Sequence, residues 1–435
     1  MERRRTPPKV SRVKKIKIAV VGLGYVGLPL ALAFAKRGCS VLGVEIDKHR
    51  LRQIRNKESY ISDISDQELR RAVTSQRFSV TGDFSSLKGA DVVIICVPTP
   101  LKRNYSPNIS YIKQAVRSIS RNLKKGALVV LESTTYPGTT EDVILPLLER
   151  RNRKHGKDFY LCFSPERIDP GNRRFPVHKI PKIIGGINKK ATRLGVSVYK
   201  RVIDRVVPVS SARSAEAVKL LENTFRLINI GLIDELAMMA HRMDMDIWEI
   251  IDAAKTKPFG FMPFYPGPGV GGHCIPKDPL YLYWKARHYG FRSRFIKLAS
   301  GVISKMPEYI VDRIIESAGK SRKRGQLKVL VVGVTYKKDV KDLRKSPALD
   351  IIEILRKRKV DVSYYDPIIP YLKFHRTNLR SIEIKRRRAL ARFDCVVIAT
   401  DHSNLDYKFI LRRSRLVFDT RNVYKGVKSK KLRRL

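Results

Sequence analysis

Short apolar runs bounded by glycine, proline and polar residues recur through the first half of the chain. They cover residues 18–21, 40–44, 90–97 and 127–131, and helical patterns separate several of them. Runs of this kind are typical of strands that are buried on both faces, as in parallel sheets covered by helices. Similar runs return at residues 328–333, 360–366, 394–400 and 416–420. The pattern predicts two α/β units, each a Rossmann-like doubly wound parallel sheet.

A stretch without proline, residues 212–242, lies between these units and predicts one long central helix. Apolar residues recur along it at helical spacing and predict a buried stripe, formed by Val218, Leu221, Phe225, Ile228 and Leu232. We therefore expect four regions: a basic, disordered arm over residues 1–15, a first domain over 16–211, a central helical region over 212–320 and a last domain over 321–435.

A glycine motif follows the first predicted strand and opens the first predicted helix. Gly22, Gly24 and Gly27 have the GxGxxG spacing, in which the first glycine makes a tight turn, the second lets a pyrophosphate approach and the third lets the helix pack on the strand. The next strand ends at Glu45, where a carboxylate would hold ribose hydroxyls and repel a 2′-phosphate. The context predicts NAD as the cofactor.

Polar residues stand where the following strands end. Thr99, Ser133 and Thr134 occupy positions at which open parallel sheets meet their ligands, although each could instead cap a helix or a turn. Glu166 follows the strand over residues 159–163 and is a candidate general base, with an exposed turn carboxylate as the alternative.

Residues 265–282 form the segment with the densest glycine and proline content. Four glycines precede Cys274, and Lys277 and Asp278 follow it, so the segment must be a loop rather than a helix or strand. An exposed thiol in such a loop could act as a nucleophile; an incidental cysteine in a structural turn is the alternative. The other four cysteines sit in apolar runs or at a helix end, where they fit the core: Cys39, Cys96, Cys162 and Cys395.

Two further sets of polar residues lie in helical and strand-end positions. Lys219 and Asn223 are four residues apart and share one face of the long helix, although they are not a charge pair. The turn after the strand at 328–333 lacks the GxGxxG motif. It is accompanied by Lys337, Arg344 and Arg421, which would suit a different phosphate-bearing ligand or belong to a solvated surface.

Composition bounds the class of protein. The 435 residues include 89 Lys and Arg against 40 Asp and Glu, a net charge of +49, but the cations are spread along the chain, which favours a basic solvated surface over nucleic-acid binding. Five cysteines without CxxC spacing argue against a disulfide framework and a zinc site. No apolar run reaches transmembrane length and no signal peptide begins the chain, so we expect a cytoplasmic protein.

Seven segments together resemble the UDP-glucose/GDP-mannose dehydrogenase family, in order from residue 17 to residue 424. They read GLGYVGLP (22–29), CVPTPL (96–101), ESTTYPGTT (132–140), SPERIDPG (164–171), AEAVKLLENT (215–224), GGHCIPKDP (271–279) and GVTYKKD (333–339). The segment KTKPFGFMPFYPGPG (255–269) is most similar to the UDP-N-acetylglucosamine 6-dehydrogenase branch.

The resemblance implies an NAD-dependent, four-electron oxidation of the C6 hydroxyl of a UDP-sugar to a carboxylate. Cys274 would form the thiohemiacetal and thioester, and Lys219 and Asn223 would stabilise the developing oxyanion. Asp278 with Thr134 would hold a water or take the alcohol proton, and Glu166 would activate the hydrolytic water.

It also implies binding residues, a homodimer formed through the central helical region and a place in polysaccharide or glycan biosynthesis. The implied NAD-binding residues are Gly22, Gly24, Tyr25, Val26, Gly27, Glu45, Arg50, Pro98, Thr99, Ser133 and Thr134. The implied substrate-binding residues are Glu166, Arg167, Lys219, Asn223, Tyr265, Gly267, Gly269, Gly271, Lys337 and Arg421. No metal, specific nucleic acid or membrane insertion is implied.

The chain departs from the family pattern at several positions. Ser304 and Asn108 replace the expected Asn and Asp, Lys345 stands where Glu is usual, and Asp234 stands where we expect Asn. Three alternative functions stay open: the same chemistry on UDP-glucose or another UDP-hexose, a two-electron hydroxyacid-type dehydrogenase, and a non-catalytic polyanion-binding protein.

Overall fold

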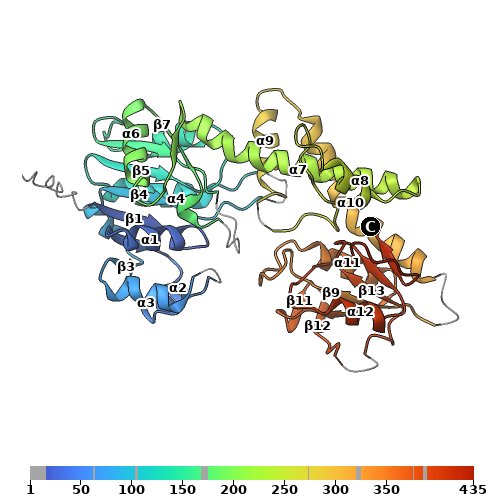
Figure 1. The fold of residues 1–435 in the computed structure, drawn as a ribbon. Helices are drawn as coiled ribbons and strands as arrows, with labels where there is room; N and C mark the ends of the chain where they lie inside the picture. The colour runs from blue at the N-terminus through green and yellow to red at the C-terminus, as the bar shows by residue number, and fades with distance from the viewer. Residues whose placement is uncertain are drawn as a thin grey trace, which may run out of the picture. The chain divides into compact units, whose positions relative to one another are not determined.

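A computed structural model describes residues 16–61, 64–102, 106–167, 175–272, 274–319, 325–375, 377–385 and 389–435. The expected arm over residues 1–15 and most of the basic segment at 321–325 lie outside these ranges. The chain divides into two compact units that meet between Lys219 and Leu220 (Figure 1).

The first unit is built on an eight-stranded sheet in the order β3-β2-β1-β4-β5-β6-β7-β8. Every neighbouring pair is parallel except β6 and β7, which are antiparallel. The strands are β1 (Lys17–Val21), β2 (Ser40–Val44), β3 (Phe78–Thr81), β4 (Val92–Ile95), β5 (Ala127–Leu131), β6 (Phe159–Phe163), β7 (Lys182–Gly186) and β8 (Val206–Pro208). Because β1 lies between β2 and β4, the strand order reverses beside the glycine motif, where such sheets bind ligands.

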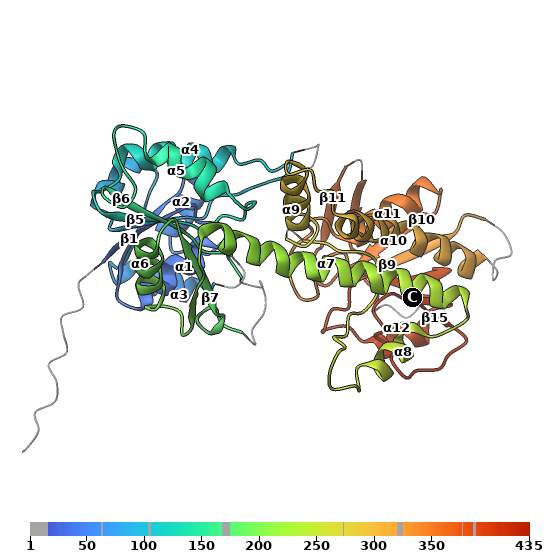
Figure 2. The same cartoon turned by 90° about the horizontal axis from the view of Figure 1, so that it is seen from above.

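Helices cover both faces of this sheet, as its continuous apolar strands require. Figure 2 shows α1, α3 and α6 on one face and α4 and α5 on the other. Alternate strand residues supply the two cores: Val20 and Ile94 pack with the first group of helices, Val21 and Ile95 with the second. The helices of the unit are α1 (Gly27–Lys36), α2 (Lys48–Arg55), α3 (Asp66–Thr74), α4 (Ser110–Asn122), α5 (Leu145–Leu148) and α6 (Lys189–Tyr199).

The long helix is α7 (Ala212–Arg242), with the bounds that the sequence predicts. The predicted buried stripe is wrong at three of its five positions, because Leu221, Phe225 and Leu232 are 67%, 45% and 52% exposed. The other two, Val218 and Ile228, are partly buried and pack against core clusters. Leu220, next to Leu221, and Leu227, two residues after Phe225, are buried instead. α7 carries apolar residues on more than one face, so periodicity alone does not identify the face that packs inside the chain. Three more helices follow it: α8 (Ile247–Ala254), α9 (Asp278–Arg287) and α10 (Arg294–Gly319).

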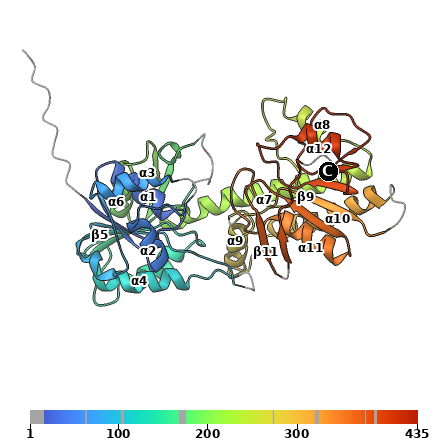
Figure 3. The same ribbon diagram turned by 90° about the horizontal axis from the view of Figure 1, so that it is seen from below.

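The second unit contains a five-stranded parallel sheet in the order β10-β9-β13-β14-β15 and a separate hairpin of β11 and β12. Figure 3 shows α12 on one face of the sheet and α10 and α11 on the other. Both predicted Rossmann-like sheets are thereby confirmed. The elements are β9 (Lys328–Val332), α11 (Pro347–Lys357), β10 (Asp361–Tyr365), β11 (Tyr371–Phe374), β12 (Thr377–Arg380), β13 (Cys395–Ile398), α12 (Tyr407–Arg413), β14 (Val417–Asp419) and β15 (Leu432–Arg434).

Among the helices that the structure describes, none combines the length and the apolar character needed to cross a membrane.

Candidate active site

Two of the three glycines of the first motif are sterically required, and the remaining one is not. Gly22 has φ of +91°, and a Cβ there would lie 2.8 Å from the backbone oxygen of Cys96. A Cβ on Gly27 would lie 1.9 Å from the oxygen of Gly22, whereas a Cβ on Gly24 would meet nothing within 4 Å. The turn therefore needs its first and third glycines for its own packing. At Gly24 the backbone stands open, as close approach of a pyrophosphate at the start of α1 requires.

Glu45 at the end of β2 is buried and orders the same turn. Its carboxylate accepts hydrogen bonds from the backbone N–H of Leu23 at 3.0 Å, Ile46 at 2.8 Å and Asp47 at 3.1 Å. Arg50 lies 3.5 Å from it. The predicted ribose-binding carboxylate thus also holds the glycine turn against the end of β2.

The other predicted NAD-binding residues lie around the carboxyl ends of β1, β4 and β5. Thr99 and Ser133 are buried, and the Ser133 hydroxyl donates to the oxygen of Val97 at 2.8 Å, which ties the ends of β4 and β5 together. Thr134 is half-buried and Pro98 is exposed. Tyr25 is 46% exposed beside the half-buried Val26.

Glu166, the candidate base, belongs to a buried charged cluster. Its Oε2 lies 3.2 Å from the ammonium of Lys182, which also lies 2.9 Å from Glu132 Oε2. The Tyr199 hydroxyl donates to the other oxygen of Glu132. Arg167 donates to the oxygen of Pro181 at 2.7 Å, which joins the segment after β6 to the start of β7. Glu166 is therefore not the exposed turn carboxylate of the alternative interpretation.

A second buried carboxylate, Glu216, fastens the start of α7 to the segment after β5. It accepts from the N–H of Gly138 at 2.5 Å and from the N–H and hydroxyl of Thr140 at 2.8 and 2.6 Å. Burial raises the pKa of Glu216 to about 7, against the lowering effect of these hydrogen bonds. Lys219 follows one turn later and is also buried.

In the second unit, Cys274 lies one turn before α9. Its backbone oxygen accepts from the N–H of Lys277 at 3.1 Å and of Asp278 at 2.8 Å, so the turn over residues 275–277 leads from the cysteine into the helix. Asp278 is buried and accepts a hydrogen bond from Asn223 Nδ2 at 2.6 Å, which fastens the cysteine loop to α7. The predicted oxyanion donor and proton acceptor of this unit are therefore hydrogen-bonded to each other, and the predicted nucleophile precedes Asp278 by four residues. Lys277 is buried, with its ammonium 5.2 Å from the ring centre of Tyr281.

Cys274 is exposed, whereas the other four cysteines of the sequence are buried, as their apolar contexts predict. Burial raises the pKa of each of those four thiols, in the case of Cys395 to about 12. They are poor nucleophiles, because the reactive form of cysteine is the thiolate.

The glycines before Cys274 let the loop pack closely on the turn after β9, on the start of α11 and on Arg421. A Cβ on Gly271 would lie 2.5 Å from the Cβ of Tyr336, and one on Gly267 would lie 3.1 Å from the Arg421 guanidinium. Gly269 has φ of +122° and packs against Pro347. Tyr265 stacks on Trp248, with ring centres 5.9 Å apart. The predicted substrate-binding glycines thereby lie against the turn that carries Lys337 and against Arg421.

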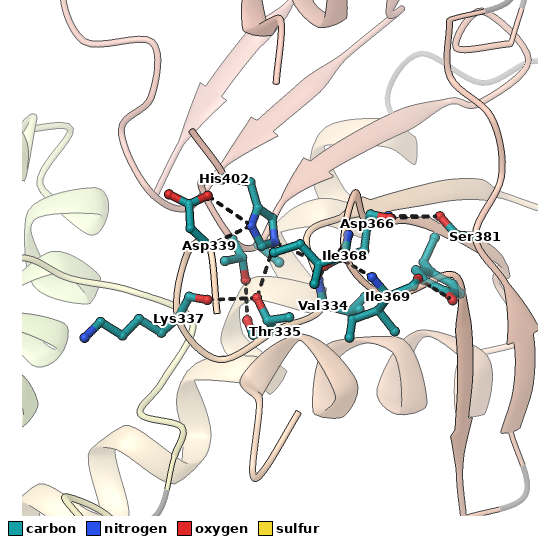
Figure 4. Close-up of polar contacts among 12 residues, drawn as sticks. Val334, Thr335, Lys337, Asp339, Asp366, Ile368, Ile369, Ser381 and His402 are labelled. Atoms are coloured by element: carbon teal, nitrogen blue, oxygen red, sulfur yellow. Dashed lines mark hydrogen bonds and ion pairs between the residues drawn. The ribbon is translucent and has the colours of Figure 1, made fainter. Parts of the chain in front are cut away.

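Figure 4 shows the polar contacts that order the turn carrying Lys337. His402 is fully buried; its Nδ1 accepts from the N–H of Asp339 at 3.1 Å, and its Nε2 lies 3.2 Å from Asp366 Oδ2. Burial opposes ionisation of Asp366, but hydrogen bonds from His402 and from the N–H groups of Val334 and Ile368 outweigh it and lower the pKa. His402 and Asp366 thus fix both sides of the turn.

Arg344 and Arg421 differ in how they are engaged. The Arg344 guanidinium pairs with Asp342, at 2.5 Å from Nη2 to Oδ2. Arg421 Nε donates to the oxygen of Ala399 at 2.9 Å, which aims the side chain from the end of β14 toward Gly267. Arg421 is the better placed of the two to meet a ligand at the glycine loop.

Several engaged residues were not singled out from the sequence: Glu132, Lys182, Tyr199, Glu216, Asp366 and His402. A signal exists for two of them. Glu132 directly follows an apolar strand and Lys182 begins one, and a buried charged residue in such a position is unusual. The others could be found only from the fold, because their partners are distant in the sequence.

Comparison with known proteins agrees with these features. The NAD-binding, central and UDP-binding domain models of the UDP-glucose/GDP-mannose dehydrogenase family match residues 16–203, 213–302 and 330–426. A UDP-N-acetyl-D-mannosamine dehydrogenase of Pyrococcus horikoshii is 35% identical, over 94% of this chain and 96% of the relative.

A UDP-N-acetyl-D-glucosamine 6-dehydrogenase of Pseudomonas aeruginosa is 37% identical, over 82% of this chain and 83% of the relative. A solved structure of a UDP-D-ManNAc dehydrogenase from P. horikoshii has a TM-score of 0.86 over 96% of this chain and 99% of that one. With an NAD-binding and a UDP-binding domain in their expected places, the chain belongs to the UDP-glucose/GDP-mannose dehydrogenase family of nucleotide-sugar dehydrogenases.

Proposed function

We propose that the protein oxidises the C6 hydroxyl of a UDP-N-acetylhexosamine to a carboxylate, in two NAD-dependent steps that share a covalent intermediate on Cys274. The observation that carries this proposal is the exposed Cys274 one turn before α9, in a loop that the hydrogen bond between Asn223 and Asp278 ties to α7. A simple two-electron dehydrogenase needs no such thiol. NAD, when bound, accepts the two electrons of each step.

The chain's residues then divide the remaining work. Asp278 takes the proton of the C6 hydroxyl, directly or through a water held with Thr134, as the alcohol becomes an aldehyde. Cys274 adds to the aldehyde carbon, and Lys219 and Asn223 stabilise the oxyanion of the resulting thiohemiacetal. Oxidation of this adduct leaves a thioester, which water hydrolyses with Glu166 as the base.

UDP-N-acetylglucosamine is the sugar nucleotide that we propose first, because of the segment over residues 255–269. UDP-N-acetylmannosamine is the second candidate, since relatives of both names have similar identity to this chain, 35% and 37%. Lys337, Arg421 and the glycines at 267, 269 and 271 would hold the UDP moiety. We expect the uronate product to serve polysaccharide or glycan synthesis in the cytoplasm.

We also propose a homodimer formed through the central helices. The support is a set of large apolar side chains on α7 and α10 that are exposed to solvent in the single chain: Leu221, Phe225, Leu232, Phe295 and Leu298. Covering such side chains removes apolar surface from water, which is the main driving force of stable association.

The decisive experiment measures NADH yield at completion with UDP-N-acetylglucosamine, UDP-N-acetylmannosamine and UDP-glucose, using the wild type and Cys274→Ala. Two NADH per sugar from one N-acetylated substrate, lost in the variant, would support the proposal and identify the sugar. Two NADH from UDP-glucose alone would keep the chemistry and change the substrate. One NADH per sugar, unaffected by the substitution, would contradict the covalent mechanism.

A further inference from the structure

The charged cluster around Glu166 contains more ionisable groups than a single base requires. Lys182, Glu132 and Glu166 are 6%, 1% and 6% exposed, and Tyr199 is fully buried beneath them. The cluster forms where the carboxyl ends of β5 and β6 meet the start of the antiparallel β7. Burying these charges carries a large desolvation cost, so a buried ion pair is weak support for stability and calls for another explanation.

Lys182 is held as a cation between the two carboxylates. Burial alone would lower the pKa of Lys182, but Glu132 and Glu166 outweigh it and raise that pKa. Burial raises the pKa of Glu132 to about 7, against the attraction of Lys182. With both carboxyls ionised, the cluster carries two negative charges and one positive charge.

Three described groups beside the cluster, two thiols and a phenol, are held in their neutral forms. Burial raises the pKa of Cys96, of Cys162 and of Tyr199, and the nearby Glu132 adds to each effect. The Lys182 ammonium lies 5.4 Å from the centre of the Tyr199 ring. Among the described contacts of Glu166, charge is therefore supplied by Lys182 directly and by Glu132 through Lys182.

We propose that Lys182 and Glu132 are positioning residues for Glu166, in which Lys182 holds the carboxylate in place and Glu132 balances the charge of the lysine so that Glu166 stays basic. This inference rests on the proposed role of Glu166 in thioester hydrolysis. A lysine paired with Glu166 alone would stabilise the ionised carboxylate and make it a weak base. A second carboxylate on the same lysine restores basicity without losing the hydrogen bond.

The step that these residues would tune is a hydrolysis without electron transfer. The oxygen of a water molecule bonds to the thioester carbon while Glu166 accepts one of its protons. The carbon–sulfur bond then breaks, Cys274 leaves as a thiolate, and the sugar carries the new carboxylate. The rate of this step should follow the fraction of Glu166 that is ionised and its basicity.

Substitutions at the two positioning residues should therefore shift the acid limb of the pH–rate profile, the rise in hydrolysis rate as Glu166 ionises, in opposite directions. Glu132→Gln leaves Lys182 paired with Glu166 alone, so the limb should move to lower pH and the rate on the plateau should fall. Lys182→Met leaves two buried carboxyls that share a proton, so the limb should move to higher pH. A neighbouring charge typically shifts a carboxyl pKa by about one to three units. The double variant, which loses one charge of each sign, should return toward the wild type.

The test follows decay of the Cys274 thioester against pH, by intact-mass spectrometry after a single turnover with NAD and UDP-N-acetylglucosamine or whichever UDP-sugar the wild type oxidises. Lys124→Met, which breaks an exposed lysine–carboxylate pair with Asp91 in the same unit, is the matched control and should leave the profile unchanged. Thermal midpoints of all variants show whether each one folds. If Lys182→Met does not fold, the isosteric Glu132→Gln and the charge-compensated double variant still test the direction of the shift.

Opposite shifts in the two single variants, with recovery in the double variant, would support the inference, because a merely structural role would not change the sign. Shifts in the same direction, or none, in variants that fold and form the thioester would overturn it. Absence of a thioester in the wild type would instead refute the proposed function.

Discussion

Asp234 is the residue at which a single substitution should most clearly change the response to pH. It lies on α7 and is fully buried, and its Oδ1 accepts the N–H of Gly267 at 3.0 Å. Within the described ranges its Oδ2 has no hydrogen-bond partner. Burial raises the pKa of Asp234 to about 7, although the hydrogen bond from Gly267 and the charge of Arg421 oppose this.

The size of the effect follows from the difference between the folded and unfolded pKa. An unfolded aspartate titrates near 3.9, and each unit of difference corresponds to about 1.4 kcal/mol. Because the folded pKa is the higher one, the folded state binds the extra proton between pH ~4 and ~7. The free energy of unfolding therefore falls across this window, by up to about 4 kcal/mol. The loss is complete once the pH exceeds the folded pKa of about 7.

Asp234→Asn should remove this loss. Asparagine keeps an acceptor oxygen for the N–H of Gly267 and is neutral at every pH, so nothing has to ionise in the buried site. We expect the variant to be more stable than the wild type by about 2–4 kcal/mol above pH 8, and nearly equal to it near pH 4.

Urea denaturation at pH 4.5, 6.5 and 8.5 measures this difference, and native-state hydrogen exchange of the Gly267 amide assigns it to the second unit. Asp361→Asn, at an exposed position on β10, is the control and should follow the wild type at each pH. Equal stability of Asp234→Asn and wild type at pH 8.5, or a gap that does not grow with pH, would refute the reasoning.

Three further predictions follow from the site and the central helices. Gly27→Ala should lower NAD affinity at least about tenfold and also lower stability, because its Cβ would collide with the backbone. Gly24→Ala should fold normally and lose only NAD affinity. NADH fluorescence measures the affinity, and thermal unfolding measures the stability. His402→Ala should raise KM for the UDP-sugar about tenfold or more with a smaller change in kcat, since it loosens the turn that carries a proposed phosphate ligand, and an unchanged UDP affinity by calorimetry would contradict this. Leu232→Glu should convert a dimer into monomers by light scattering, while Tyr371→Glu, at an equally exposed apolar position, should not.

The parts of the fold that depend on local chemistry were predictable from the sequence. Buried parallel strands leave continuous apolar runs, and the helix at α7 has the predicted bounds because no proline interrupts it. The glycine turn was predictable because its residue types follow from the local backbone. Only glycine tolerates the φ of +91° at Gly22 and the contact at Gly27, so the spacing of these residues reports the backbone directly.

Contacts between distant segments were not predictable. Lys182 meets Glu132 across 50 residues and Glu166 across 16, and Asn223 meets Asp278 across 55. No periodicity links such positions, since the sheet order and the antiparallel placement of β7 bring them together. The buried face of α7 is ambiguous for a related reason: burial depends on what packs against a helix, and its own pattern offers more than one apolar face.

The high positive charge can now be separated from the chemistry. Of the lysines and arginines that the structure describes, only Lys182, Lys219 and Lys277 are buried. Each of the three is a proposed site residue or lies next to one. The other cations are at least partly exposed, as expected from the cost of burying a charge.

The attraction of these exposed cations for polyanions should weaken steeply with salt, because it depends on counterion release. Catalysis by a buried cluster such as Glu166 with Lys182 should be far less sensitive, because buried pairs are poorly screened. Salt should therefore dissociate any bound nucleic acid while leaving thioester hydrolysis nearly unchanged, and this outcome would assign most of the exposed charge to a solvated exterior rather than to the cluster around Glu166.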